Sequence, residues 1–216
     1  MAELTLIIGN KNLSSWSLRP WLVAKVLDIP FREVKIRLDQ PSTREEIRRY
    51  SPSGFVPALR DGDLVIGDSL AIIEYLSELY PERGAWPEDR AARALARSAA
   101  AEMHAGFSNL RGTWPMDMVH EDKGLSCPPN VAKDLARIDD LWTDARRRYG
   151  RSGPFLFGKF SAADAMFAPV ISRIRTYGPV KRFAPLQDYM AAVWNLPAME
   201  EWREGARKEA AEGWYD

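Results

Sequence analysis

The stretch from Ser53 to Pro81 constrains the fold of this chain more than any other, and it reads SGFVPALRDGDLVIGDSLAIIEYLSELYP. Because proline cannot donate to a sheet ladder, Pro57 belongs at the start of a strand or on a sheet edge. Asp61-Gly62 predicts a tight turn into a second strand. If the Val56-Pro57 peptide bond is cis, the Val56 backbone turns outward and is free to pair with an extended ligand.

A helix with apolar periodicity follows this hairpin, and Asp68 and Ser69 stand at its start. The amides and the dipole of a helix N-terminus form a ready site for an anion, and the Ser69 hydroxyl adds a donor. The Asp68 carboxylate can accept hydrogen bonds from an ammonium group. Both residue types are also favoured N-caps, so a purely structural role is the alternative interpretation.

This combination of motifs resembles the glutathione site of the glutathione S-transferase superfamily. There, Val-Pro precedes a hairpin, and a stretch like Asp-Ser-Leu-Ala-Ile-Ile-Glu-Tyr-Leu opens the next helix. The resemblance implies that glutathione is the co-substrate. It also implies that Val56, Asp68 and Ser69, with Pro57 beside them, hold its cysteinyl backbone and its γ-glutamyl end.

One position in this site departs from the family pattern. Phe55 stands just before Val-Pro, where many members carry a lysine, an arginine or a glutamine. The glycine carboxylate of glutathione must therefore meet another cation. Lys11 and Arg44 are both candidates, and the sequence does not choose between them.

The composition excludes several classes of function. The 216 residues include 30 lysines and arginines against 30 aspartates and glutamates, so no net field attracts nucleic acid or an anionic membrane. A single cysteine, Cys127, excludes an intrachain disulfide and a cysteine cluster for a metal. No stretch is long and apolar enough to span a bilayer, and the start MAELTLIIGN lacks the charges of a signal peptide. We expect a cytoplasmic protein that binds no nucleic acid, no membrane and no metal.

The first 80 residues alternate between strand and helix patterns. Ser17 is the expected N-cap of the first helix, which keeps Pro20 in the first turn, where proline is tolerated. Thr43 and Glu46 form a capping-box pattern for a short second helix. The predicted elements are a strand over 4–9, a helix over 18–29, a strand over 31–38, a helix over 43–50, and the hairpin and helix of 53–81. This β-α-β-α-β-β-α order matches a thioredoxin-like domain.

Strand patterns vanish after a linker over 81–88. Ser161 and Asp164 form a second capping box, with structural roles, ahead of a buried apolar run over 165–171. The predicted helices cover 88–109, 131–149, the segment after Ser161, 186–194 and 198–209. This half resembles the helical domain of glutathione transferases. The expected fold is therefore an α/β thioredoxin-like domain over 1–80 followed by an all-α domain over 89–216, which contributes the electrophile pocket.

The segment Ser14-Ser15-Trp16-Ser17-Leu18-Arg19 resembles the Ser-Ser-Cys-Ser-Trp-Arg signature of the zeta-class transferases, the maleylacetoacetate isomerases. The match implies that the Ser14 hydroxyl stabilises the glutathione thiolate and that Ser15 is a supporting donor. Trp16 replaces the zeta cysteine, which rules out a mixed disulfide there and argues against a thiol exchanger of the omega or glutaredoxin type. Turn and capping roles are the alternative for Ser14 and Ser15, and we assign Ser17 to such a role.

The stretch from Met103 to Met116 is the candidate lining of the electrophile pocket. Phe107, Trp114 and Met116 offer apolar surface, as does Trp16, and Arg111 offers a cation for an acidic substrate. The alternative is that most of the apolar residues in this stretch belong to the core. His104 in the same stretch is interpreted as structural. By counting from the capping box, the zeta arginine that binds a substrate carboxylate aligns with Thr176. Arg173 and Arg175 flank that position.

The resemblance implies a cytoplasmic, homodimeric transferase of serine type that conjugates glutathione to a small hydrophobic electrophile. One alternative is a glutathione-dependent cis–trans isomerase of the maleylacetoacetate type. Another, from a different class, is a non-catalytic binding or scaffold protein that has kept the fold. The Trp214-Tyr215 tail could fold over the cleft or hang free.

Overall fold

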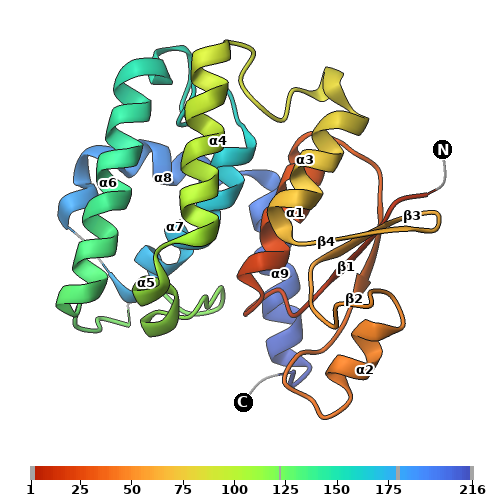
Figure 1. The fold of residues 1–216 in the computed structure, drawn as a ribbon. Helices are drawn as coiled ribbons and strands as arrows, with labels where there is room; N and C mark the ends of the chain where they lie inside the picture. Colours follow the sequence, from red (N-terminus) through yellow and green to blue (C-terminus); the bar gives the residue numbers. More distant parts are fainter. Residues whose placement is uncertain (1–2, 122, 179–180, 215–216) are drawn as a thin grey trace.

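The computed structural model describes residues 3–121, 123–178 and 181–214. A sheet with its helices forms one half of the molecule, and a group of longer helices forms the other (Figure 1). The first half contains β1 (Thr5–Ile8), α1 (Ser15–Val26), β2 (Arg32–Lys35), α2 (Thr43–Arg48), β3 (Ala58–Asp61), β4 (Leu64–Gly67) and α3 (Ser69–Leu79). This order is the predicted one.

The four strands form a mixed sheet in the order β2-β1-β3-β4. β1 runs parallel to β2, with Leu6 opposite Glu33, and antiparallel to β3, with Leu6 opposite Leu59. Side chains alternate across a strand, so Leu6 and Ile8 join the core that contains α1 and α3, while Ile7 packs with Ile47 of α2 on the other face. The sheet is therefore covered on both faces, as in a thioredoxin-like domain.

The start of α1 differs from the prediction. The helix begins at Ser15 with Ser14 as N-cap, so Pro20 lies inside the helix rather than in its first turn. Ser17 is not a cap. Its buried hydroxyl oxygen accepts the Gly9 amide at 3.1 Å and the Ser14 hydroxyl at 2.7 Å. These tertiary hydrogen bonds replace the local role that serine preferences predict.

The second helix also begins differently. Ser42 is its N-cap, and the Ser42 hydroxyl donates to Glu46 at 2.6 Å. The Thr43 hydroxyl instead accepts the Gln40 amide at 2.9 Å and donates to the Arg37 carbonyl at 2.7 Å. The predicted Thr43 cap is therefore wrong by one residue, because the turn before the helix takes the threonine hydroxyl.

Among the described residues beyond α3, all regular elements are helices, and the β-structure there consists of two isolated bridges near Phe155. The α-helices are α4 (Arg90–Ala105), α5 (Ser108–Thr113), α6 (Pro129–Tyr149), α7 (Ala162–Tyr177), α8 (Gln187–Trp194) and α9 (Pro197–Ala211). The predicted single helix over 88–109 is broken at Gly106, where Phe107 takes a left-handed conformation with φ of 56°. The fold class is nevertheless the expected one, an α/β domain followed by an all-α domain.

The central helix α7 begins with the predicted capping box. The buried Asp164 carboxylate accepts the Ser161 amide at 2.8 Å, the Ser161 hydroxyl at 3.0 Å and the Leu156 amide at 3.0 Å. α7 packs against α1 and α4, so it joins the two halves. Arg19 of α1 adds a cross-link, because its Nε donates to the Met166 carbonyl at 3.1 Å.

The last helix, α9, lies beside α1 (Figure 1) and holds the loop between β1 and α1. Glu209 of α9 is fully buried, and its Oε2 accepts the Lys11 amide at 2.8 Å and the Asn12 amide at 3.4 Å. Its Oε1 lies 2.9 Å from Nζ of Lys35. Trp202 of the same helix donates from Nε1 to the Lys11 carbonyl at 2.6 Å. The C-terminal helix therefore grips the loop that leads to Ser14.

The chain beyond α9 turns toward β2. Arg37 donates to the Gly213 and Trp214 carbonyls at 2.6 and 3.2 Å, and Nζ of Lys35 lies 4.4 Å from the Trp214 ring centroid. Tyr215 lies outside the described residues. The described part of the tail takes neither of the two positions considered, because Trp214 packs beside β2 and is absent from the residues that line the cleft.

The Glu209 contacts lead to a stability prediction. Glu209→Gln should lower the free energy of unfolding by about 2 kcal/mol, because charge-assisted hydrogen bonds to two buried amides and the Lys35 ion pair are weakened. Urea unfolding at pH 7 measures the change. Glu212→Gln, on the exposed turn after the helix, is the matched control and should change stability by less than about 0.5 kcal/mol. Equal effects of the two variants would contradict the role of Glu209.

A second prediction concerns pH. Burial raises the pKa of Asp164 from 3.8 to about 6, against the opposing effect of its three donors. The folded state therefore favours the protonated form, and the stability that protonation contributes is full below about pH 4 and lost as the pH rises through about 6. The unfolding free energy of the wild type minus that of Asp164→Asn should fall by about 3 kcal/mol over this range.

Asp144→Asn provides a control with the opposite sign. Hydrogen bonds from Arg147 and then Arg148 lower the pKa of Asp144. The unfolding free energy of the wild type minus that of Asp144→Asn should therefore increase, rather than decrease, as the pH rises from acidic values. A difference for Asp164→Asn that stays constant between pH 4 and 7 would show that this carboxyl group does not titrate in that range.

Candidate functional site

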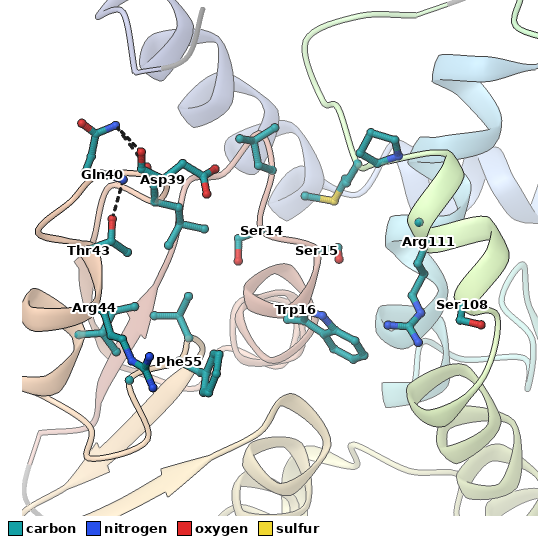
Figure 2. A pocket seen from close by; sticks show the side chains of 18 of the residues that line it. Ser14, Ser15, Trp16, Asp39, Gln40, Thr43, Arg44, Phe55, Ser108 and Arg111 are labelled. Atoms are coloured by element: carbon teal, nitrogen blue, oxygen red, sulfur yellow. Dashed lines mark hydrogen bonds between the residues drawn. The ribbon is translucent and has the colours of Figure 1, made fainter.

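A cleft of about 850 Å³ opens between the two halves of the molecule. Figure 2 shows Ser14, Ser15 and Trp16 at its centre, Arg44 and Phe55 on the side of α2, and Ser108 and Arg111 of α5 on the opposite side. The start of α1 therefore faces a space whose two walls come from different halves of the chain.

The two serines at the start of α1 differ in their hydrogen bonds. The Ser14 hydroxyl donates to Ser17 Oγ at 2.7 Å. The Ser15 hydroxyl oxygen lies 3.5 Å from Nη2 of Arg173, a long contact in which it accepts, and its proton has no acceptor among the described residues. Both serines are buried to a similar degree and line the cleft. The Ser15 proton is thus available to an anion at this helix N-terminus, whereas the Ser14 proton must turn away from Ser17 to reach one.

Three guanidinium groups lie around this part of the cleft without a paired carboxylate among the described residues. Nε of Arg173 donates to the Trp114 carbonyl at 2.7 Å and its Nη1 to the Pro169 carbonyl at 3.0 Å. Burial, followed by repulsion from Arg111, lowers the pKa of Arg173 to about 10, so it stays charged at neutral pH. Arg111 donates from Nε to the Gly106 carbonyl at 3.1 Å.

Arg19 is the third member of this group, and it is fully buried. Burial, followed by repulsion from Arg173 and Arg111, lowers its pKa well below the ordinary value. Its Nη1 and Nη2 have no hydrogen-bond partner among the described residues. The Trp16 ring covers this guanidinium at 4.1 Å and faces Arg111 at 5.1 Å. Trp16 therefore lies between two cations at the cleft.

A second pocket of about 580 Å³ adjoins the cleft at Trp16, Phe55 and Val56. The Val56-Pro57 peptide bond is cis, as the sequence context suggested. The Val56 backbone makes no hydrogen bond to the described residues. Ser69 also lines this pocket, and its buried hydroxyl has no partner there. The pocket thus presents unused polar groups from two different elements.

Asp68 completes this pocket and uses its two oxygens differently. Oδ1 accepts the Leu70 and Ala71 amides at 2.8 and 3.2 Å, so Asp68 is the N-cap of α3. Oδ2 lies 2.6 Å from Nε2 of His104 on α4. Burial raises the pKa of Asp68, but the His104 hydrogen bond and the two amides outweigh burial and lower it overall. The capping role and a role in the pocket coexist in one side chain.

Most of the predicted site residues come together. The cleft and its adjoining pocket are lined by Ser14, Ser15, Trp16, Phe55, Val56, Pro57, Asp68, Ser69 and Arg111. Arg44, the other candidate cation, also lines the cleft, where Figure 2 shows it beside Phe55.

Lys11 does not reach the cleft, which corrects one of the two candidates for the glycine carboxylate. Its side chain is buried, with Nζ 2.9 Å from Glu33 and within 5.4 Å of the Trp21 and Trp202 ring centroids. α9 covers this loop and therefore takes the Lys11 side chain into the interior.

Phe107 and Trp114 are core residues rather than lining residues. Phe107 is 8% exposed and Trp114 1% exposed, and neither lines the cleft. The Trp114 ring stacks on Tyr177 with centroids 5.4 Å apart. The break of the helix at Gly106 turns this segment inward, while Met116 lines the cleft.

Sequence reasoning missed two residues of the site, Arg173 and His104. Thr176, which counting aligned with the zeta arginine, is buried and donates to the Asp117 carbonyl at 2.8 Å. Arg175 turns outward to Glu121 at 3.1 Å. Arg173, one turn before, reaches the cleft instead. No local signal marked His104, because its partner Asp68 comes from the other half of the chain.

The described residues hold no group of three or more His, Cys, Asp or Glu side chains placed to bind a metal ion. Within the same ranges, no helix is long and apolar enough to cross a membrane.

Comparison with known proteins places this architecture in a family. Residues 13–79 match the family model described as glutathione S-transferase, N-terminal domain, and residues 128–207 match glutathione S-transferase, C-terminal domain. Glutathione S-transferase Z2 of Arabidopsis thaliana is 39% identical over 186 residues, which cover 83% of this chain and 81% of that protein. A probable maleylacetoacetate isomerase of Vibrio cholerae is 34% identical over 166 residues, covering 72% and 74%.

Solved structures share the fold at low identity. A glutathione transferase homolog from Burkholderia GL BGR1 with bound glutathione has a TM-score of 0.67 at 22% identity and covers 95% of this chain and 98% of its own. Glutathione transferase Omega 2S from Trametes versicolor in complex with 2,4-dihydroxybenzophenone has a TM-score of 0.72 at 19% identity and covers 98% of each chain. The matches to both halves, and the relatives above 30% identity, show that this chain belongs to the glutathione S-transferase family.

Proposed function

We propose that this protein is a glutathione transferase of serine type, which binds glutathione across the cleft and its adjoining pocket and holds the cysteinyl sulfur as a thiolate at the start of α1. The observation that carries the proposal is the position of Ser14 and Ser15, which line the cleft together with Val56, while Ser69 lines the adjoining pocket. The family membership supports glutathione as the co-substrate.

The pocket beside the cleft suits the γ-glutamyl end of glutathione. The unused Ser69 hydroxyl and the start of α3 suit its carboxylate, and the Asp68 carboxylate suits its ammonium group. The free Val56 backbone can pair with the cysteinyl amide. Arg44, on the α2 side of the cleft, is then the cation for the glycine carboxylate.

The hydrogen bonds and the helix N-terminus at this site can supply the free energy that thiolate formation requires. A free thiol has a pKa of about 8.5, and lowering it by about two units requires roughly 2.7 kcal/mol. A hydrogen bond to a charged group contributes about 1.5–3 kcal/mol, and a helix N-terminus about 0.3–1 kcal/mol. One serine donor at this position therefore suffices. The charged Arg173 beside Ser15 favours the thiolate further.

In the reaction, the thiolate attacks an electrophilic carbon of the second substrate. A carbon–sulfur bond forms, and the carbon either releases its leaving group with the bonding electron pair or, in an addition, passes the charge to a neighbouring atom that takes a proton from water. Trp16 and Met116 offer an apolar surface for that substrate.

The family relationship also supports a homodimer in the cytoplasm, and the lone Cys127 fits a reducing compartment.

Two candidate functions are open to this site besides conjugation to a hydrophobic electrophile. The position of Arg173 and Arg111 at the cleft favours an acidic electrophile, as in glutathione-dependent cis–trans isomerisation of an unsaturated diacid. The relative named as a probable maleylacetoacetate isomerase supports this second candidate. The third is the non-catalytic binding protein.

The serine assignment predicts the effect of single substitutions on bound glutathione. The thiol of glutathione on the wild type should ionise about two pKa units below its free value. Ser14→Ala should raise this bound pKa by more than one unit, and Ser15→Ala by less, because the proposal gives Ser14 the hydrogen bond to the thiolate and Ser15 a supporting one. The thiolate absorbance, titrated against pH on each protein, measures the shift. Ser108→Ala, an exposed serine on the opposite wall, is the control and should leave it unchanged.

An unchanged pKa in Ser14→Ala would contradict the role of Ser14, and a full loss of the shift in Ser15→Ala would give that role to Ser15. Glutathione binding without any shift in the wild type would favour the non-catalytic protein.

The acidic-electrophile candidate predicts a change in substrate preference. The ratio of kcat/KM for a carboxylate-bearing electrophile to that for its methyl ester should fall about tenfold, or by about 1.4 kcal/mol, in Arg173→Gln. Arg111→Gln tests the contribution of the second, less buried positive charge at the cleft. Arg175→Gln, on the same helix but turned to Glu121, should leave the ratio unchanged. A constant ratio in both variants would favour the hydrophobic electrophile.

A further inference from the structure

His104 connects the helical half of the molecule to the pocket proposed for the γ-glutamyl end of glutathione. It lies in the last turn of α4, and its Nε2 is 2.6 Å from Oδ2 of Asp68 at the start of α3. Its ring meets Trp16 edge-on, with centroids 5.4 Å apart and planes at 66°. His104 also lines the pocket that contains Ser69. It is therefore in direct contact with the carboxylate to which the proposed function assigns the ligand's ammonium group.

Asp68 has only one carboxylate oxygen, Oδ2, left for both His104 and the ammonium group of the ligand. Oδ1 is occupied by the Leu70 and Ala71 amides at the start of α3. An ammonium group must therefore approach Oδ2, which His104 already contacts. A carboxylate oxygen can accept two hydrogen bonds, so a neutral imidazole and an ammonium group can share it. A protonated imidazole instead neutralises the carboxylate and repels the ammonium group.

The other charged groups near this contact keep their charge between pH 5 and 8. Arg19 of α1 interacts electrostatically with Asp68, and Arg111 of α5 faces the other partner of His104, the Trp16 ring. Guanidinium groups stay protonated in this range. On α4 itself, Glu102 is paired with Arg137 of α6 at 2.7 Å. Histidine is the side-chain type whose charge ordinarily changes near neutral pH, and His104 is the histidine at this contact.

Asp68 remains ionised over the same range. Burial raises its pKa, but the His104 hydrogen bond and the helix amides lower it overall. The chain has two histidines, and the other, His120, contacts Asp117 at 2.9 Å. His120 is absent from the residues that line the cleft and the pocket.

We propose that His104 is a positioning residue that makes glutathione affinity depend on pH, by sharing Oδ2 of Asp68 with the ammonium group of the ligand. The proposal rests on the proposed function, since it requires the γ-glutamyl end to bind in this pocket. Neutral His104 holds the Asp68 side chain in place, and the negative charge of Asp68 then remains available to the ammonium group of the ligand. Protonated His104 competes with the ligand for the same oxygen.

The test uses S-methylglutathione, which has no titrating thiol. Its affinity for the wild type, measured by calorimetry between pH 5.5 and 8, should rise about fivefold to tenfold through the range where histidines ordinarily titrate, about pH 6 to 7. By linkage, binding near the low end of this range should release protons, which calorimetry in two buffers of different ionisation enthalpy detects. KM for glutathione should follow the same profile, while kcat at saturating glutathione should not.

Two variants separate His104 from the rest of the protein. His104→Gln keeps a hydrogen-bond donor for Asp68 but cannot titrate near neutral pH. Its affinity at pH 8 should stay within about twofold of the wild type, and the rise with pH should disappear. His120→Gln is the matched control and should keep the wild-type profile.

A ligand variant tests the ammonium group on the unaltered protein. An S-methylglutathione analogue with hydrogen in place of the γ-glutamyl amino group should bind the wild type without the rise. A rise that persists in His104→Gln, or with the analogue lacking the amino group, would overturn the proposal. Absence of S-methylglutathione binding at every pH would instead overturn the proposed function, and the inference with it.

Discussion

The buried Glu209 carboxylate is the interaction on which the position of the site depends. The loop between β1 and α1 must leave the sheet and present Ser14 and Ser15 at a helix start, and its own amides need acceptors in the interior. Glu209 accepts hydrogen bonds from the Lys11 and Asn12 amides, while Trp202 donates a hydrogen bond to the Lys11 carbonyl. An unmet buried amide costs about as much as several surface contacts contribute. The last helix of the chain therefore helps to determine where the candidate site residues Ser14 and Ser15 lie.

Two asparagine side chains of the same loop form further hydrogen bonds to both halves of the molecule. The Asn10 side chain accepts the Leu38 amide at 2.6 Å, and the Asn12 side chain accepts the Met118 amide at 2.6 Å. These bonds connect the serines to both walls of the cleft, because Leu38 leads into α2 and Met118 follows the α5 segment. A shift of either wall would therefore be transmitted to the loop. The cleft therefore lies at a hydrogen-bonded junction of the two halves rather than within one of them.

The interior beside the cleft carries a surplus of positive charge. Arg19 and Arg173 are buried, Arg111 is half-buried, and none is paired with a carboxylate among the described residues. Burying an unpaired charge opposes folding, and the lowered pKa values of Arg19 and Arg173 express that cost. An anion in the cleft relieves it. This surplus supports the proposed thiolate, and the candidate acidic second substrate, at this position.

The sequence by itself determined the order of the elements, the fold class, the proline before β3, the Asp164 capping box and most of the residues around the cleft. These features depend on local periodicity, on proline geometry and on residues close together in the chain. Only the tertiary structure decided that Ser17 binds Gly9 rather than capping α1, that Lys11 faces inward under α9, and that Arg173 reaches the cleft instead of Thr176. It also decided that His104 meets Asp68, 36 positions away. The reason is physical: local preferences select a conformation for each segment, but the partner of a buried polar group is whichever group the packing of distant segments brings within hydrogen-bond distance.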